Sequence, residues 1–274
     1  MNYSQEFLDL YNNLFAVIPY PQNVASQVAA SHPLWKEFCE LPQEVKDIFH
    51  FGGDDWNYGY IKKGSKENED QKEYYHYSFH HNELLKKHDL LGEVEKNPVA
   101  KKFFQYCDEL FGLVTDFAYE YNTVLARNNK HIKELPEQTK KGFEGPFGVI
   151  RFLHYTPPQD AEVLADPHFD RGGMTFHLYE SQEGLQFLNW DNVWTDAPVL
   201  QDETVLFSGI GLEALSDKVL QRTWHRVIAD KHATSPERYS IVLFCDFPDM
   251  QVRDRKRDGI ARLEPQEYAP KKEL

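Results

Sequence analysis

Cysteine is scarce in this sequence, which contains only Cys39, Cys107 and Cys245, far apart from one another. Their odd number and wide spacing do not fit a disulfide framework, a cysteine zinc site or a redox dithiol. We therefore expect reduced, mostly buried thiols.

Long hydrophobic runs are absent as well. No stretch reaches the roughly 18 consecutive apolar residues that a membrane-spanning helix requires, and the first residues lack the basic segment and apolar core of a secretory signal. These absences predict a soluble, cytoplasmic protein.

Basic residues are outnumbered: 30 Lys and Arg stand against 44 Asp and Glu, a formal net charge of −14. A phosphate backbone or an anionic membrane surface attracts clustered positive charge, so we expect neither nucleic acid nor membrane as a partner. The one basic cluster, at 253–258, alternates with acidic residues and is interpreted as a solvated turn. The expected partner is a small-molecule substrate, and the expected assembly is a monomer or a small homo-oligomer.

The chain divides into two regions with different hydrophobic patterns. Helical spacing dominates the first region and predicts helices at 24–38, 44–49 and 98–127. From residue 148 onward, alternation and short apolar runs predict strands at 149–155, 174–179, 185–189, 193–195, 204–208, 219–228 and 239–244. Many short strands with regular turns are typical of a sandwich or jelly roll, and no Gly/Ser-rich linker separates the two regions.

Two histidines and one aspartate suggest a metal site. On an extended strand His168 and Asp170 point to the same face, so one strand offers two ligands together. A distant strand that brings His225 to the same place completes a two-histidine, one-carboxylate set, which holds ferrous iron and leaves coordination positions open for oxygen chemistry. Because a His-x-Asp pair also occurs by chance, this interpretation depends on residues further along the chain.

Arg238 and Ser240 provide that support. They share one face at the start of the apolar run 241–245. A guanidinium fork with a neighbouring hydroxyl matches a carboxylate. Taken alone, Arg238 would not indicate a binding site, because an arginine at the start of a strand commonly extends its side chain to solvent.

In this order and at these distances, the motifs resemble the isopenicillin N synthase-like family of Fe(II)/2-oxoglutarate-dependent dioxygenases, also called the iron/ascorbate oxidoreductases. Five blocks of the C-terminal half carry the resemblance: 150–158, 168–175, 184–187, 223–227 and 238–240. A weaker likeness in the N-terminal half lies at 38–46, 58–60 and 70–75.

The resemblance implies three iron ligands that form the catalytic centre: His168, Asp170 and His225. It also implies that Arg238 and Ser240 hold the distal carboxylate of 2-oxoglutarate, and that Tyr155 contacts its metal-proximal end. The implied reaction uses Fe(II), 2-oxoglutarate and O2 to oxidise a small molecule, with ascorbate as a further reductant. The expected oxidation is a hydroxylation, which releases succinate and CO2.

The implied fold is mainly β, a double-stranded β-helix (jelly roll) barrel flanked by helices. We predict three parts: 1–145, a helical N-terminal region with short strands packed on the barrel; 146–248, the dioxygenase core; and 249–274, a C-terminal tail. His154 and His177 are interpreted as hydrogen-bonded core residues, and 62–73 as an exposed loop.

Two alternatives stay open. In the first, an Fe(II) oxidase of the same fold does not use 2-oxoglutarate, and Arg238 and Ser240 hold the substrate's own carboxylate or another co-reductant. In the second, a non-catalytic binding module has kept the barrel, which the complete ligand set disfavours. The sequence does not determine the substrate, nor the choice between hydroxylation, desaturation and cyclisation.

Overall fold

The computed structural model of this chain describes residues 3–55, 57–64, 70–127, 129–145, 148–157, 161–197, 202–250, 268 and 270–274. Most described helices precede the main run of strands: α1 (Gln5–Asn13), α2 (Gln22–Cys39), α3 (Gln43–Ile48), α4 (His81–Lys87), α5 (Leu91–Lys96), α6 (Pro98–Ala126), α7 (Leu135–Glu144) and the later α8 (Ile210–Leu215). Two 3-10 turns complete this set: η1 (Gly53–Asp55) and η2 (Pro248–Met250). No helix in these ranges is long and apolar enough to cross a membrane.

The long helix α6 follows directly from its sequence. The Asn97 side chain accepts a hydrogen bond from the Ala100 amide at 3.0 Å, and Pro98 occupies the first turn, where its missing N–H costs nothing. Phe103, Leu110 and other residues at helical spacing are buried along one face. The helices predicted at 24–38, 44–49 and 98–127 are therefore confirmed as α2, α3 and α6.

The strands form two antiparallel sheets. The seven-stranded sheet has the order β1-β9-β6-β11-β4-β3-β2, with β1 (Phe15–Pro19), β2 (Gly59–Lys63), β3 (Lys72–Ser78), β4 (Val149–Tyr155), β6 (Met174–Glu180), β9 (Glu203–Ser208) and β11 (Arg238–Cys245). The four-stranded sheet has the order β5-β10-β7-β8, with β5 (Val163–His168), β7 (Leu185–Leu188), β8 (Trp194–Asp196) and β10 (His225–Ile228).

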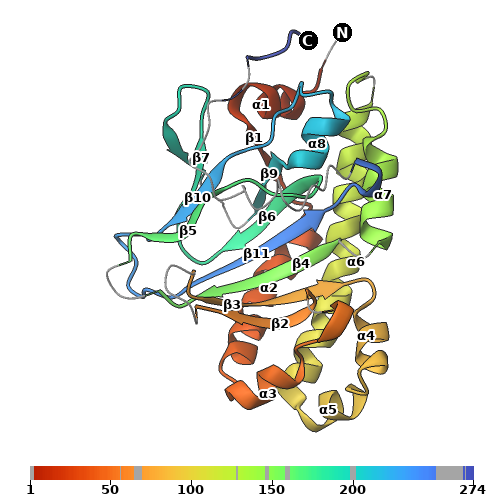
Figure 1. Ribbon diagram of the computed structural model, residues 1–274, viewed down its shortest axis with the longest axis vertical. Helices are drawn as coiled ribbons and strands as arrows, with labels where there is room; N and C mark the ends of the chain where they lie inside the picture. Colours follow the sequence, from red (N-terminus) through yellow and green to blue (C-terminus); the bar gives the residue numbers. More distant parts are fainter. Residues whose placement is uncertain are drawn as a thin grey trace.

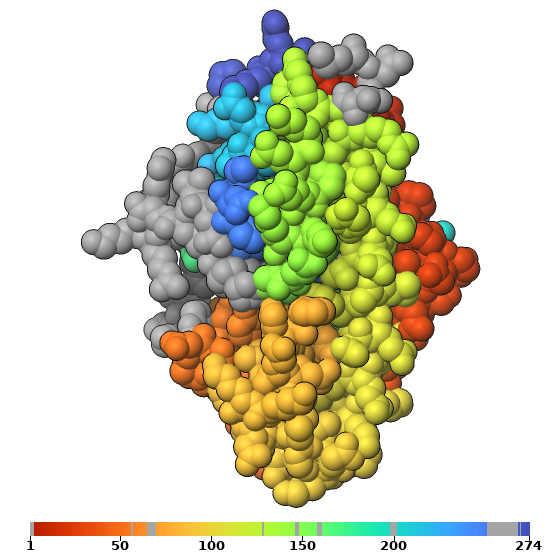
Figure 2. All heavy atoms as spheres, turned by 90° about the vertical axis from the view of Figure 1, so that its right-hand side faces the viewer, coloured from red at the N-terminus to blue at the C-terminus, as the bar shows by residue number. Residues whose placement is uncertain are grey.

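The seven-stranded sheet is covered on both faces. Its helix-facing side chains join the main core, where Phe152 packs against Trp35 of α2 and Phe103 of α6. The next residue, Leu153, points to the opposite face and packs with Leu164 of the four-stranded sheet. Figure 1 shows α2, α6 and α7 along one face of the large sheet, and Figure 2 shows α6 and α7 from outside as a continuous cover.

The main core joins the two halves of the chain, because residues of α2 and α6 share one apolar cluster with residues of β4, β6 and β11. With long helices beside two sheets, the architecture is mixed α/β, so the expectation of a mainly β chain is corrected. The predicted strand 219–228 begins only at His225. Part of the predicted loop 62–73 is strand, since β2 reaches Lys63 and β3 starts at Lys72.

Candidate metal centre

Strand pairing brings His168 and His225 together. β5 and β10 are antiparallel neighbours, and His225 lies directly opposite His168 in their register. The two imidazole centroids are 4.2 Å apart. Residues distant in the sequence therefore place two metal-binding nitrogens side by side.

Asp170 joins them from the connection after β5 and not from the strand itself, which corrects the expectation that one strand carries both ligands. The backbone there is tightly packed: a Cβ on Gly209 would lie 2.3 Å from the Gly172 carbonyl oxygen and 3.1 Å from that of Asp170. The Ile210 amide also donates to the Asp170 carbonyl at 3.1 Å. The start of α8 thus holds the loop that positions this carboxylate.

The ligand atoms of His168, Asp170 and His225 all lie within 4.8 Å of one another. The Nδ1 atom of His168 is 2.7 Å from the Asp166 carbonyl oxygen, and that of His225 is 3.1 Å from the Thr223 carbonyl oxygen. A carbonyl oxygen only accepts, so each Nδ1 must carry the proton, and each Nε2 keeps its lone pair for a metal ion.

The carboxylate is oriented in the same way. Thr175 donates from Oγ1 to the Oδ2 atom of Asp170 at 2.5 Å, while Oδ1 of Asp170 lies 3.9 Å from Nε2 of His225. One oxygen is therefore occupied by a hydroxyl and the other faces the imidazoles.

Electrostatics favours the protonation states that a cation needs. Burial lowers the pKa of His168 and of His225, so both imidazoles are neutral near pH 7. Burial by itself would raise the pKa of Asp170, but the two histidines and the Thr175 hydroxyl outweigh it and hold this pKa below its usual value. Two neutral imidazoles and one carboxylate suit a divalent cation with mixed nitrogen and oxygen preference.

A cavity of about 60 Å³ opens beside these three residues, between the two sheets. Its apolar lining comes from both sheets: Leu153, Leu185, Phe207, Val227, Val242 and Phe244. Its other polar lining comes from the seven-stranded sheet: Lys72, Arg151, Tyr155, Thr175, His177 and Ser240. The candidate metal centre thus lies in a space with one polar wall.

The three residues expected to hold a co-substrate lie on β4 and β11. Tyr155 and Ser240 line the cavity, and Arg238 pairs with Tyr155 in the register of the two strands. The Arg238 guanidinium is fully buried and lies 5.7 Å from the centroid of the Tyr155 ring. Arg238 is absent from the described lining of the cavity, so it stands behind Tyr155.

Arg238 has a partner that the sequence did not indicate. It forms an ion pair with Glu180, the last residue of β6, and its Nε donates to the Gln182 carbonyl oxygen at 3.3 Å. One terminal nitrogen, Nη1, is buried and has no hydrogen-bond partner among the described residues. Burial by itself would raise the pKa of Glu180, but Arg238 and His177 keep it below its usual value. No motif marked Glu180, because only strand pairing reveals its partner.

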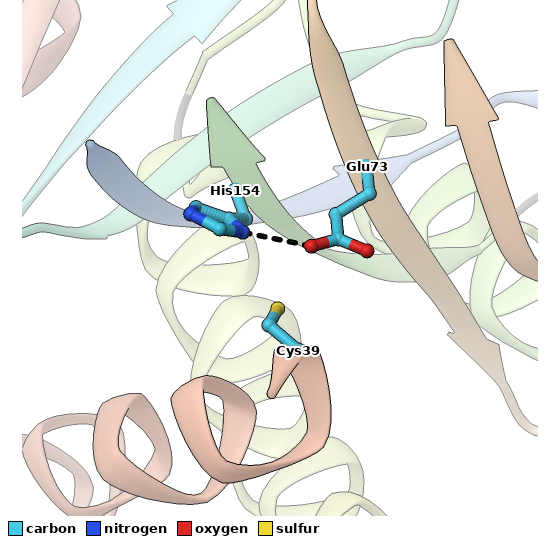
Figure 3. A group of neighbouring side chains, drawn as sticks. All are labelled: Cys39, Glu73 and His154. Carbon is cyan, nitrogen blue, oxygen red and sulfur yellow. Dashed lines mark hydrogen bonds and ion pairs between the residues drawn. The ribbon is translucent and has the colours of Figure 1, made fainter. Parts of the chain in front are cut away.

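A second group of metal-binding residue types lies on the opposite, helix-facing side of the large sheet. Figure 3 shows Cys39 at the end of α2, Glu73 on β3 and His154 on β4. Their candidate ligand atoms also lie within 4.8 Å of one another. His154 Nδ1 donates to Glu73 at 2.8 Å, in agreement with the expectation of a hydrogen-bonded core histidine.

The positive charge in this cluster comes from the protein itself. Lys46 Nζ lies 2.6 Å from one Glu73 oxygen and donates to the Cys39 carbonyl at 2.8 Å, and the Tyr60 hydroxyl donates to Glu73 at 2.6 Å. Burial by itself would raise the pKa of Glu73, but the hydrogen bonds from His154, Lys46 and Tyr60 hold it at about 2. An ammonium already neutralises this carboxylate, so the cluster is a closed polar network.

Comparison with known proteins agrees with the site at the cavity. Residues 146–247 match the model of the 2OG-Fe(II) oxygenase superfamily, which covers all three residues of the candidate metal centre. Over 113 residues, the chain is 34% identical to a 1-aminocyclopropane-1-carboxylate oxidase of Musa acuminata, a match that covers 38% of this chain and 36% of that protein. The chain spans between 36% and 52% of the length of the curated relatives that it matches.

Solved structures share the fold. A protein of Shewanella oneidensis described as an oxygenase aligns with a TM-score of 0.73 at 21% identity, over 94% of each chain. The structure of JOX2 in complex with 2OG, Fe and JA aligns with a TM-score of 0.65 at 19% identity, over 86% of this chain and 68% of that one. At these identities the likeness concerns the fold.

Proposed function

We propose, from the premise that this chain belongs to the 2OG-Fe(II) oxygenase superfamily of oxidoreductases, that it is an Fe(II)- and 2-oxoglutarate-dependent dioxygenase that hydroxylates a small molecule and releases succinate and CO2. The single observation that carries the proposal is the convergence of the His168, Asp170 and His225 ligand atoms within 4.8 Å at the wall of a cavity.

The two facing sheets are assigned to the double-stranded β-helix of this superfamily, flanked by helices. We divide the chain into a helical region at 1–145, the dioxygenase core at 146–248 and a tail at 249–274. Support comes from the family match, which ends at residue 247. Residues 251–267 and 269 of the tail, including the basic cluster at 253–258, lie outside the described residues.

The three ligands fit ferrous iron by their chemistry. Nε2 of His168 and of His225 is free to coordinate, because Nδ1 is used in each ring, and Asp170 supplies one oxygen and a compensating negative charge. Such a facial set leaves three positions for other ligands. The hydrogen bonds on Nδ1 and on the carboxylate restrict the rotation of all three side chains before the metal binds.

2-Oxoglutarate is assigned to the polar wall. Ser240 and Tyr155 offer hydroxyls in the cavity, and Nη1 of the buried Arg238 is a donor that has no acceptor among the described residues. A carboxylate that reaches these groups receives charge-assisted hydrogen bonds.

When bound, Fe(II) and 2-oxoglutarate supply the oxidising chemistry, and the protein contributes position and shielding. Phe207 packs beside His225 with ring centroids 4.7 Å apart, and Leu185 and Val227 line the same side of the cavity. These apolar side chains exclude water from the metal centre and leave the substrate as the reacting partner.

The test is succinate formation by purified protein that is loaded with Fe(II) under anaerobic conditions and then given 2-oxoglutarate and air. We expect turnover that disappears in His225→Ala and falls in Arg238→Ala. Arg226→Gln is the matched control, because Arg226 lies on β10 next to His225 but contacts Trp194 and Gln186 and does not line the cavity. Iron binding without any succinate, with or without candidate substrates, would contradict the co-substrate assignment.

One observation favours a second candidate, an Fe(II) oxidase that does not consume 2-oxoglutarate. Glu180 already neutralises Arg238, so the guanidinium has less need of a carboxylate from a ligand. A curated relative carries the name oxidase and has a carboxylate in the name of its substrate. Oxygen consumption with a substrate mixture and ascorbate, in the absence of 2-oxoglutarate, separates the two candidates.

A further inference from the structure

A second guanidinium, that of Arg151, lies at the wall of the same cavity and has no carboxylate of its own. Arg151 is on β4 and lines the cavity together with His168 and Asp170. Within the described ranges, its only hydrogen bond uses Nε and it forms no ion pair with a carboxylate, although its positive charge helps to lower the pKa of Asp170. Both terminal nitrogens therefore remain available to a ligand.

The protein holds this guanidinium in a fixed orientation. Nε of Arg151 donates to Nε2 of His76 at 2.5 Å, and His76 in turn uses Nδ1 to donate to the Asn57 carbonyl oxygen at 2.6 Å. This arrangement requires a neutral His76 in one tautomer. The guanidinium also lies 5.1 Å from the Tyr74 ring centroid and 4.6 Å from that of Phe244. Two aromatic contacts and one hydrogen bond thus fix its plane.

Two other cations near the cavity form ion pairs among the described residues, whereas Arg151 forms none there. Arg238 has Glu180, and Lys72 lies 2.7 Å from Asp70. Arg151 is only partly buried, and a ligand carboxylate that reaches it would gain a charge-assisted contact. In a chain with 44 acidic residues, the lack of a carboxylate partner here is a specific feature.

The other nearby anions have their own partners. Asp170 faces Nε2 of His225 and accepts from Thr175, and it belongs to the metal centre. In the proposed function, the carboxylates of 2-oxoglutarate are taken by the metal and by Arg238 with Ser240. The substrate to be oxidised is the remaining source of negative charge.

We propose that this substrate carries a carboxylate, which the two terminal nitrogens of Arg151 bind in a bidentate manner. This inference rests on the proposed function and adds to it the chemical class of the substrate. The planar fork of a guanidinium matches the two oxygens of a carboxylate. Arg151 then anchors one end of the substrate at the wall beside Asp170, and the rest of the molecule contacts the apolar lining.

The experiment uses acetate and acetamide, which have nearly the same shape and differ in charge. The full-length protein is loaded with Zn(II) in place of iron and saturated with 2-oxoglutarate, so that the metal and Arg238 are occupied. Binding of each probe is then measured by ligand-observed NMR. We expect acetate to bind the wild type about tenfold more tightly than acetamide, the effect of one charge-assisted contact.

The comparison variant is Arg151→Gln, in which the preference for acetate should disappear. Arg226→Gln is the matched control: Arg226 also donates from Nε, to Gln186 at 2.8 Å, and also lies on an aromatic ring, that of Trp194 at 4.4 Å. It faces away from the cavity, so Arg226→Gln should keep the wild-type preference. If Arg151→Gln fails to fold, Arg151→Met is a second neutral variant, whose flexible thioether can stay between the two rings.

An unchanged preference for acetate in the neutral Arg151 variants overturns the inference, and so does a wild type that binds both probes equally. Binding of 2-oxoglutarate to the Zn(II)-loaded wild type is measured first and by itself. If 2-oxoglutarate does not bind, the proposed function fails, and the acetate titration on the Zn(II)-loaded protein alone still decides the role of Arg151.

Discussion

Similar residue types lie on the two sides of the seven-stranded sheet, in the helix-facing cluster and in the candidate metal centre, but their charges are balanced differently. On the helix-facing side, Glu73 and His154 meet Cys39, and the ammonium of Lys46 lies 2.6 Å from the carboxylate (Figure 3). On the cavity side, His168 and His225 lie on neighbouring strands of the four-stranded sheet beside Asp170, and the partners of these three side chains are a hydroxyl and two backbone carbonyls.

This difference shows that ligand types within reach of one another do not by themselves make a metal site. Glu73 accepts from an ammonium, a phenol and an imidazole, so its charge is already balanced. Among the described residues, Asp170 receives one hydroxyl hydrogen bond, from Thr175, and no ammonium or guanidinium contacts it. The free lone pairs of the histidines and the carboxylate charge on the cavity side are what attract a cation.

The largest loss of stability is expected when the charge balance between Lys46 and Glu73 on the helix-facing side is removed. Lys46→Met leaves the Glu73 carboxylate buried without its cation, and we expect a loss of about 3–5 kcal/mol in the free energy of unfolding. Urea denaturation measures it. The double variant Lys46→Met/Glu73→Gln should recover much of the loss, and a double variant as unstable as the single one would contradict the account.

Acid should weaken the same network. The pKa of Glu73 is held at about 2 in the folded protein, below its unfolded value, so its stabilising effect is complete above about pH 4.5 and is lost as the pH falls toward 2. The contribution is on the order of 3 kcal/mol. Denaturation curves across this pH range should show a slope in the wild type that is absent from Lys46→Met/Glu73→Gln. Equal slopes would show that other carboxylates dominate the pH dependence of stability.

The next prediction compares the candidate metal centre with the helix-facing cluster by their affinity for a divalent metal ion. His168→Ala should weaken divalent metal binding more than about 100-fold, because even the outer partners of metal ligands contribute 10–100-fold. His154→Ala is the control from the helix-facing cluster and should leave metal affinity unchanged while it lowers stability. Calorimetric titration with Zn(II) gives both affinities. A metal stoichiometry that depends on His154 would show that the closed network also binds an ion.

The smallest expected effect concerns the partner of the buried arginine. Glu180→Gln removes the counter-charge of Arg238 and should lower the free energy of unfolding by about 1–3 kcal/mol without ligand. If 2-oxoglutarate reaches Arg238, the ligand should raise the melting temperature of Glu180→Gln more than that of the wild type. Thermal unfolding with and without 2-oxoglutarate provides the comparison. Equal shifts would favour the oxidase that does not use this co-substrate.

Much of the fold could be predicted because its signals are local. The apolar spacing of α6 and the short apolar runs of β4, β6, β9 and β11 repeat with the period of the element they form. The short helices α1, α4 and α5 were missed, since a few turns carry too little periodicity. The strand predicted at 219–228 was too long, because the apolar residues before His225 are buried but lie outside β10.

The candidate site was predictable to the extent that a motif marked it. His168, Asp170 and His225 stand in a recognisable order, and the fold brings them together. Glu180 lies outside the motifs, Arg151 and Glu73 lie within blocks of the resemblance but were given no role there, and Glu73 was also assigned to an exposed loop. Their roles depend on cross-strand neighbours: Arg238 for Glu180, His76 for Arg151, and Lys46 for Glu73.

The sequence by itself determined much of the order of helices and strands and the donor set of the candidate metal centre, because these are properties of spacing along the chain. Only the tertiary structure decided which charges are neutralised. Successive side chains of β3 and β4 point to opposite faces of the sheet, so neighbours in sequence meet different partners. The position of Lys46, Glu180 and the unpaired Arg151 relative to those faces separates a closed network from an open site.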